Sequence, residues 1–89
     1  MGRYRVLIKP SAVKELETIP RKKDRQRLVR RIRRLADEPR PPGCQKLSAR
    51  DLYRVRQGPY RIVYSIQDVE LTVQVVKIGD RKDIYRGAF

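Results

Sequence analysis

Three arginines stand close together in two short segments of alternating apolar and polar residues. Arg54 and Arg56 fall in Leu52–Gln57, and Arg61 falls in the next segment, Tyr60–Ile66. Because successive side chains of a strand face opposite sides, this alternation places the apolar residues on one face and the arginines on the other. Guanidinium groups bind phosphate oxygens through paired hydrogen bonds. The pattern therefore predicts a cationic face that suits a phosphate ester.

The pairing of these two strands follows from a two-residue turn at Gly58-Pro59. With that turn, Arg56 lies opposite Arg61, and the apolar residues meet on the other face. Directly opposed side chains have Cβ atoms about 4.5–5.5 Å apart, where like charges repel. We therefore expect an anion between the arginines. The same pattern also fits a solvated outer face, and composition alone does not separate the two.

A further arginine and a tyrosine follow the last apolar segment. Gly79 ends that segment, and Arg81 and Tyr85 then stand four residues apart. On one helical turn, side chains with this spacing point the same way. Taken alone, the spacing also fits a surface arginine beside a half-buried tyrosine.

A second basic region occupies Arg21–Arg34, with nine Lys or Arg residues and one acid, Asp24, so it carries +8 of the net charge of +13. Solvated helices usually carry acidic partners one turn away from their cations, and this region lacks them. It is predicted to bind RNA or an acidic protein, with a solvated face as the alternative. The assigned RNA- and ribosome-binding residues are Arg21, Lys22, Lys23, Arg25, Arg27, Arg30, Arg31, Arg33, Arg34 and Lys46.

Missing residue types narrow the chemistry. The 89 residues include no histidine and one cysteine, Cys44, so the usual nucleophile, metal and proton-shuttle arrangements cannot be assembled. Any catalysis must use Arg, Lys, Tyr or carboxylates, and we expect no metal or cofactor. The lone cysteine, the lack of a signal-peptide pattern and the lack of an apolar stretch of about 18–20 residues predict a cytoplasmic protein without a membrane partner.

A first strand is predicted over Tyr4–Ile8, and Pro10 ends it. Apolar residues at helical spacing follow. Ser11 is predicted to cap a helix whose apolar stripe consists of Ala12, Val13, Leu16 and Ile19. A second helix is predicted over Pro20–Asp37, with a buried stripe of Leu28, Val29, Ile32, Leu35 and Ala36.

The proline-rich segment Pro39–Gly43 predicts a stiff connection, because it cannot continue a helix. Three strands follow at Leu52–Gln57, Tyr60–Ile66 and Leu71–Ile78. Residues 1–89 are thus predicted to form one α+β domain. Its order is a strand, a helical hairpin and a three-stranded antiparallel meander, forming one sheet with two helices packed on one face.

Several of these residues recur together in a known family. They are Tyr53-Arg54-Val55-Arg56, Gly58, Tyr60-Arg61-Ile62-Val63-Tyr64, Val75-Val76-Lys77-Ile78-Gly79-Asp80-Arg81 and Tyr85, with Lys46-Leu47 before them. In this respect the sequence resembles the RelE branch of the RelE/ParE toxins of prokaryotic toxin–antitoxin systems. The resemblance spans nearly the whole chain and includes the early helical hairpin.

The resemblance implies a small basic endoribonuclease that enters the ribosomal A site, cuts mRNA and is held inactive by an acidic RelB-type antitoxin. It implies that Arg61 and Arg81 bind the scissile phosphate and that Tyr85 stacks on a base or assists the 2′-hydroxyl. Arg54 and Arg56 stand where the best-known relatives have lysine. Because arginine scarcely gives up a proton, we expect them to act as electrostatic clamps. The general base stays open between Tyr85 and a substrate-assisted route.

Cleavage by a neighbouring 2′-hydroxyl requires orientation, proton transfer and cations, with no obligatory metal or enzyme nucleophile. The composition is compatible with this chemistry. Two alternatives remain from the sequence: a ParE-like inhibitor of DNA gyrase without ribonuclease activity, and a non-catalytic module that binds RNA or the ribosome.

Overall fold

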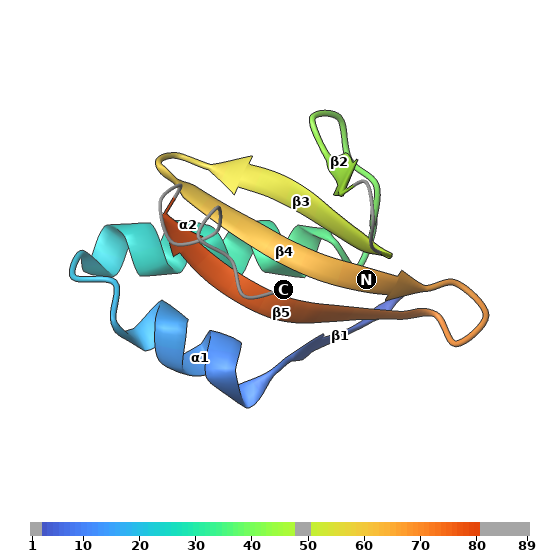
Figure 1. Ribbon diagram of the computed structural model, residues 1–89, viewed down its shortest axis with the longest axis horizontal. Helices are drawn as coiled ribbons and strands as arrows, with labels where there is room; N and C mark the ends of the chain where they lie inside the picture. Colours follow the sequence, from blue (N-terminus) through green and yellow to red (C-terminus); the bar gives the residue numbers. More distant parts are fainter. Residues whose placement is uncertain (1–2, 48–50, 81–89) are drawn as a thin grey trace.

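The computed structural model describes residues 3–47 and 51–80. These residues contain two helices and five strands. Their order is β1 (Arg5–Ile8), α1 (Pro10–Glu17), α2 (Lys22–Arg34), β2 (Gln45–Leu47), β3 (Leu52–Gln57), β4 (Tyr60–Gln67) and β5 (Thr72–Asp80). The strands form one sheet in the order β1-β5-β4-β3-β2 (Figure 1). β1 runs parallel to β5, and all other neighbouring strands are antiparallel. The predicted α+β class is confirmed.

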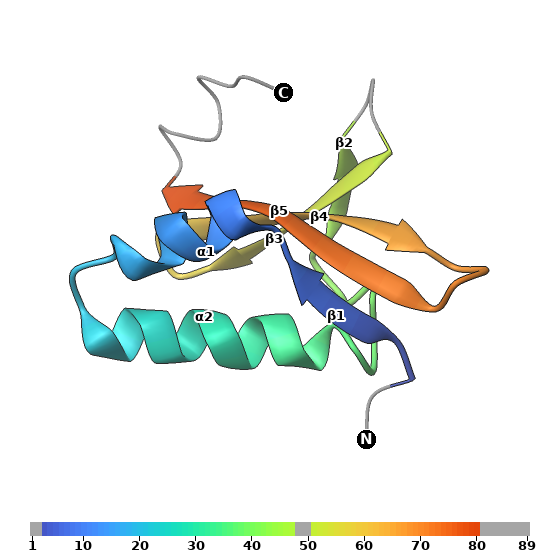
Figure 2. The same ribbon diagram turned by 90° about the horizontal axis from the view of Figure 1, so that it is seen from below.

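Both helices contribute to one hydrophobic core. Figure 2 shows α2 as a layer on one side of the sheet, with α1 beside β5. The buried cluster consists of Ala12 and Ile19 from the α1 region, Leu28, Ile32 and Leu35 from the α2 region, and Val55, Ile62, Tyr64, Val73, Val75 and Ile78 from the strands. Removing these apolar side chains from water provides the main driving force for folding.

The first helix begins two residues before its predicted start. α1 starts at Pro10, and Lys9 rather than Ser11 occupies the N-cap position, without a side-chain hydrogen bond. Proline suits the first helical position because its φ is already fixed and its missing N–H would have no partner there. Val13 is 37% exposed, so it does not belong to the buried stripe.

The second helix is shorter than the predicted Pro20–Asp37. Arg21 has extended backbone, with φ −90° and ψ 122°, and the helix starts at Lys22. Ile19, just before it, is buried, and Nη1 of Arg25 donates to the Ile19 carbonyl oxygen. The connection between the helices is therefore folded back against the first turn of α2, which explains why Pro20 lies outside the helix.

The other end of α2 is tied to the start of the chain. The helix ends at Arg34, and the next three residues form a turn. The N–H of Tyr4 donates to the carbonyl oxygen of Ala36 at 2.9 Å. The N–H groups of Leu35, Ala36 and Asp37 donate to the carbonyl oxygens three residues back, the spacing of a tighter turn, so the α-helix stops short of the predicted Asp37.

A strand that the sequence pattern does not predict forms one edge of the sheet. β2 pairs with β3, with Gln45 opposite Arg54 and Lys46 opposite Tyr53. Three residues are too few to show a two-residue period, so the pattern gave no signal. The other strands agree with the predicted ranges to within two residues at each end.

The β4–β5 pairing contains an irregularity. Its register shifts between Val63 and Tyr64, which leaves Val76 without a partner on β4. An extra residue in a strand reverses the alternation of faces beyond it. Ile78 is therefore buried in the same core as Val75, although the two residues stand three positions apart and would face opposite sides of a regular strand.

An ion pair ties the end of β4 to the proline-rich connection. Nη2 of Arg40 lies 2.9 Å from Oδ2 of Asp68, and Nη1 lies 3.1 Å from Oδ1. The Tyr4 hydroxyl donates to the same Oδ1 at 2.8 Å, and the Arg40 guanidinium lies 5.2 Å from the centre of the Tyr53 ring. The hydrogen bonds from Arg40 and then from Tyr4 lower the pKa of Asp68 to about 2.

Asp68→Asn is expected to reduce the slope with which the free energy of unfolding falls as the pH is lowered from 3.8 towards 2. Because the folded pKa of about 2 lies below the ordinary value of 3.8, ionised Asp68 stabilises the fold above pH 3.8, and this contribution disappears as the pH falls towards 2. Urea unfolding followed by circular dichroism across this range measures the slope. Glu17→Gln, which removes an exposed carboxylate on α1, is the control. Equal slopes for Asp68→Asn and wild type would contradict the assignment.

Candidate active site

β3 and β4 bring two of the predicted arginines together. Arg56 lies directly opposite Arg61, which confirms the predicted pairing. Gly58 has a φ of +60°, a value that glycine adopts without strain. Proline, with φ near about −65°, fits the second position of a type II′ turn. Gly58 and Pro59 therefore match the two conformations that this hairpin requires.

The three arginines differ in exposure. Arg56 is exposed, whereas Arg54 is 8% and Arg61 5% exposed. The alternative of a fully solvated face is therefore wrong for Arg54 and Arg61. Where less water surrounds a cation, it attracts an anion more strongly. The hairpin thus presents one guanidinium at the surface and two that are largely removed from solvent.

The edge strand β2 holds one of these guanidiniums. Gln45 stands directly opposite Arg54, and Nη2 of Arg54 donates to Oε1 of Gln45. A neutral amide oxygen can orient the guanidinium without cancelling its charge. The neighbouring strand therefore fixes the position of the Arg54 guanidinium.

β5 bounds the arginine face on the other side. Gly79 lies opposite Arg61, so β5 contributes no side chain beside it. Nζ of Lys77 lies 2.7 Å from Oε2 of Glu15, and Oε1 of Glu15 accepts the Ile78 N–H at 3.1 Å. Glu15 therefore fixes β5 to α1 and neutralises a lysine at the margin of this face.

The predicted contributions of Arg81 and Tyr85 fall outside the described residues. The described part of β5 ends at Asp80, which lies opposite Tyr60, one position beyond the Arg61–Gly79 pair. The last described residue of β5 therefore lies one position along the sheet from the partner of the buried Arg61.

Two absences hold for residues 3–47 and 51–80. Within these ranges, no three His, Cys, Asp or Glu side chains group together in a way that could hold a metal ion. Neither of the described helices is long and apolar enough to cross a bilayer.

The basic residues assigned to RNA binding take different positions around α2. The exposed ones are Arg21, Lys22, Lys23, Arg27, Arg30, Arg33 and Arg34. Arg25 and Arg31 are half-buried, and Arg25 is engaged by the Ile19 carbonyl. Lys46 lies on β2 with its side chain 59% exposed, and its Nζ is 3.7 Å from Oδ1 of Asp51. The structure therefore separates the exposed cations from those that also serve packing.

The geometry can be compared with known proteins. Residues 6–85 match the family model of the ParE toxin of the type II toxin–antitoxin system parDE. The chain belongs to the ParE toxin family. A relative of this ParE-family chain, an Escherichia coli RelE-like toxin protein, is 29% identical over 87 residues, which cover 93% of this chain and 90% of that protein.

The fold of this ParE-family chain is similar to that of solved RelE structures. The RelE–RelB complex from Pyrococcus horikoshii OT3 matches with 33% identity and a TM-score of 0.79 over 89% of this chain and 96% of that one. The isolated Escherichia coli RelE toxin matches with 25% identity and a TM-score of 0.74 over 93% and 92% of the two chains. The resemblance to the RelE branch is confirmed, and the protein is a RelE-like toxin of a type II toxin–antitoxin system.

Two residues of this ParE-family site were missed from the sequence. Gln45 left no signal, because β2 itself was not predicted. Glu15 did leave one, since it shares a helical face with the buried Ala12 and Ile19. A carboxylate on an apolar stripe requires a cationic or hydrogen-bonding partner, and Lys77 provides it.

Proposed function

We propose that this toxin is a ribosome-dependent endoribonuclease that cleaves mRNA in the A site and so inhibits translation. The observation that carries the proposal is the cross-strand pair of Arg56 and Arg61, with Arg54 on the same face. β3 and β4 contribute no Asp or Glu. An RNA phosphate group could be held between these cations by paired hydrogen bonds.

The proposed reaction is attack of the 2′-oxygen of a nucleotide on its own 3′-phosphorus, with departure of the 5′-oxygen of the next nucleotide. Arg61, together with Arg81, binds the nonbridging oxygens and stabilises the negative charge that develops there. Arg54 and Arg56 act as clamps, because arginine does not serve as a base near neutral pH. Tyr85 stacks on a base or assists the 2′-hydroxyl. This chemistry requires neither a metal nor a cofactor.

The other surfaces fit the same proposal. The exposed cations of α2, with Lys46, dock on ribosomal RNA, since a row of arginines binds a phosphate backbone without reading its sequence. The cognate partner is an acidic RelB-type antitoxin, because several structural relatives are RelE–RelB complexes. Both roles place the protein in the cytoplasm.

The proposal is tested with purified protein and ribosomes programmed with a defined mRNA. Mapping of 5′ ends is expected to show new cuts within the A-site codon only when ribosomes are present. Absence of cuts in ribosome-bound mRNA, from a folded toxin, would reject the proposal.

A second candidate function is inhibition of DNA gyrase without RNA cleavage. It is favoured by the family match, which is to ParE toxins. The arginines of the β3–β4 hairpin, Arg54, Arg56 and Arg61, would then bind no RNA substrate. Induction of the toxin would cause gyrase-dependent DNA breaks while mRNA stays intact. Sequencing of mRNA ends and measurement of DNA breaks in the same induced culture separates the two candidates.

A further inference from the structure

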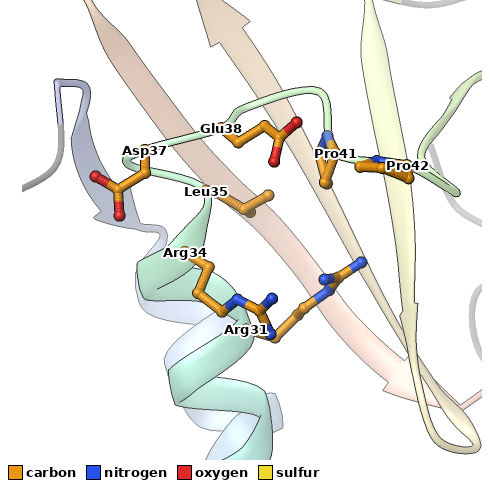
Figure 3. A pocket seen from close by; sticks show the side chains of 7 residues that line it. All are labelled: Arg31, Arg34, Leu35, Asp37, Glu38, Pro41 and Pro42. Carbon is orange, nitrogen blue, oxygen red and sulfur yellow. The ribbon is translucent and has the colours of Figure 1, made fainter.

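A groove runs along α2 on the side near the end of β3. Its first part, about 260 Å³, is lined by Arg27, Arg30, Arg31, Arg34 and Gln57. Its second part, about 170 Å³, is lined by Arg31, Arg34, Leu35, Asp37, Glu38, Pro41 and Pro42 (Figure 3). Because the two parts share Arg31 and Arg34, they adjoin, and together they are called the α2 groove below.

The two ends of the α2 groove differ in charge. The first end carries four arginines at positions i, i+3, i+4 and i+7, which places them on one side of the helix over about 10 Å. None of the four forms an ion pair with another described residue. The second end carries carboxylates, and Figure 3 shows that Glu38 points towards the side of the cavity where Arg31 lies, whereas Asp37 points away.

Arg31 stands where the two parts meet. Its side chain is half-buried, and its Nε is buried without a hydrogen-bond partner in the described residues. Buried donors in folded proteins almost always have an acceptor, because leaving one unpaired is costly. The half-buried Arg31 thus fixes a positive charge at the point where the two parts of the groove meet.

We propose that the α2 groove binds an acidic peptide segment of the antitoxin, with its carboxylates on Arg27, Arg30 and Arg34 and a cationic residue at the Glu38 end. The identity of the partner rests on the proposed function. The mixed charge of the groove favours a peptide, whose charge can change sign along its length. A nucleic acid carries a phosphate at every step and would meet the Glu38 carboxylate. Among the residues that the structure describes, those lining the groove include no aromatic side chain on which a base could stack.

The outer side of α2 offers a matched control surface. Lys22 and Arg33 are exposed and do not line the groove. The double variants Arg30→Glu/Arg34→Glu and Lys22→Glu/Arg33→Glu change the net charge by the same amount, on the same helix. A difference in peptide binding between the two variants therefore depends on where the charges lie on the helix and not on the net charge.

The test uses two short peptides of identical composition, rich in glutamate with a few lysines. In one the lysines follow a block of glutamates, and in the other they are interspersed. Fluorescence titration of the whole protein is expected to show preference for the block peptide. Arg30→Glu/Arg34→Glu should weaken its binding about tenfold, Lys22→Glu/Arg33→Glu about twofold, and Glu38→Lys should remove the preference. Circular dichroism verifies that each variant is folded.

Equal weakening by the two double variants, or no preference between the peptides, would overturn the proposal. A single-stranded oligouridylate is titrated beside the peptides. If Arg30→Glu/Arg34→Glu weakens its binding more than that of the block peptide, the groove arginines serve RNA docking alone, and the proposal of an antitoxin site is wrong while the proposed ribosome-docking role of α2 stands. These titrations involve no ribosome, so a failure here is distinct from a failure of mRNA cleavage.

Discussion

Arg61→Ala is expected to slow ribosome-dependent mRNA cleavage by about 10²–10³-fold. Arg61 is 5% exposed and lies opposite Arg56, so in the proposed reaction its guanidinium would bind a phosphate where little water weakens the attraction. Charge on the nonbridging oxygens grows as the 2′-oxygen attacks, so the bond to Arg61 strengthens in the transition state. Single-turnover cleavage of mRNA on programmed ribosomes measures the rate of this step.

Two further variants separate charge, geometry and folding. Arg61→Lys keeps the charge but loses the planar fork, and we expect an intermediate loss of about tenfold. Arg5→Ala removes an exposed arginine from β1 and should leave the rate within about twofold of wild type. Thermal unfolding of each variant shows whether it is folded at the assay temperature. A folded Arg61→Ala protein that cuts at the wild-type rate would exclude Arg61 as a phosphate ligand.

The β3–β4 hairpin, with Arg56 opposite Arg61, could be predicted from the sequence because the residues that determine it are neighbours in the chain. Alternation of apolar and polar residues fixed the faces, and Gly58 with Pro59 fixed the turn. A slip of one residue would have exchanged the two faces, so only one pairing agreed with both signals. The opposition of Arg56 and Arg61 followed from these two facts.

Non-local contacts could not be predicted in the same way. β2 is only three residues long and exists because β3 offers it an edge. Val76 has no partner on β4 because the register between β4 and β5 shifts, and the sequence of one strand alone does not show such a shift. Burial of Arg54 likewise depends on a neighbour, Gln45, that the sequence pattern did not place in the sheet. Each of these features needs a second segment to define it.

Leu28→Ala is expected to lower the free energy of unfolding by about 3 kcal/mol. Leu28 is 0% exposed and belongs to the core that joins α2 to the sheet. A chain of this size has a total stability of roughly 4–13 kcal/mol, so the loss is a large part of it. The midpoint of thermal unfolding should fall by roughly 12–24 °C. Circular dichroism during heating measures this midpoint.

Val13→Ala is the matched control, because Val13 is 37% exposed on α1, and its cost should stay below about 1 kcal/mol. Leu28 lies between Arg27 and Val29 but faces the core, whereas Arg27 is exposed. Below its lowered midpoint, the Leu28→Ala protein should therefore still bind ribosomes and cut mRNA. An equal fall for both variants would show that α2 is not held to the sheet through Leu28. Lost cleavage in the folded Leu28→Ala protein would instead show that activity depends on the exact seating of the basic helix.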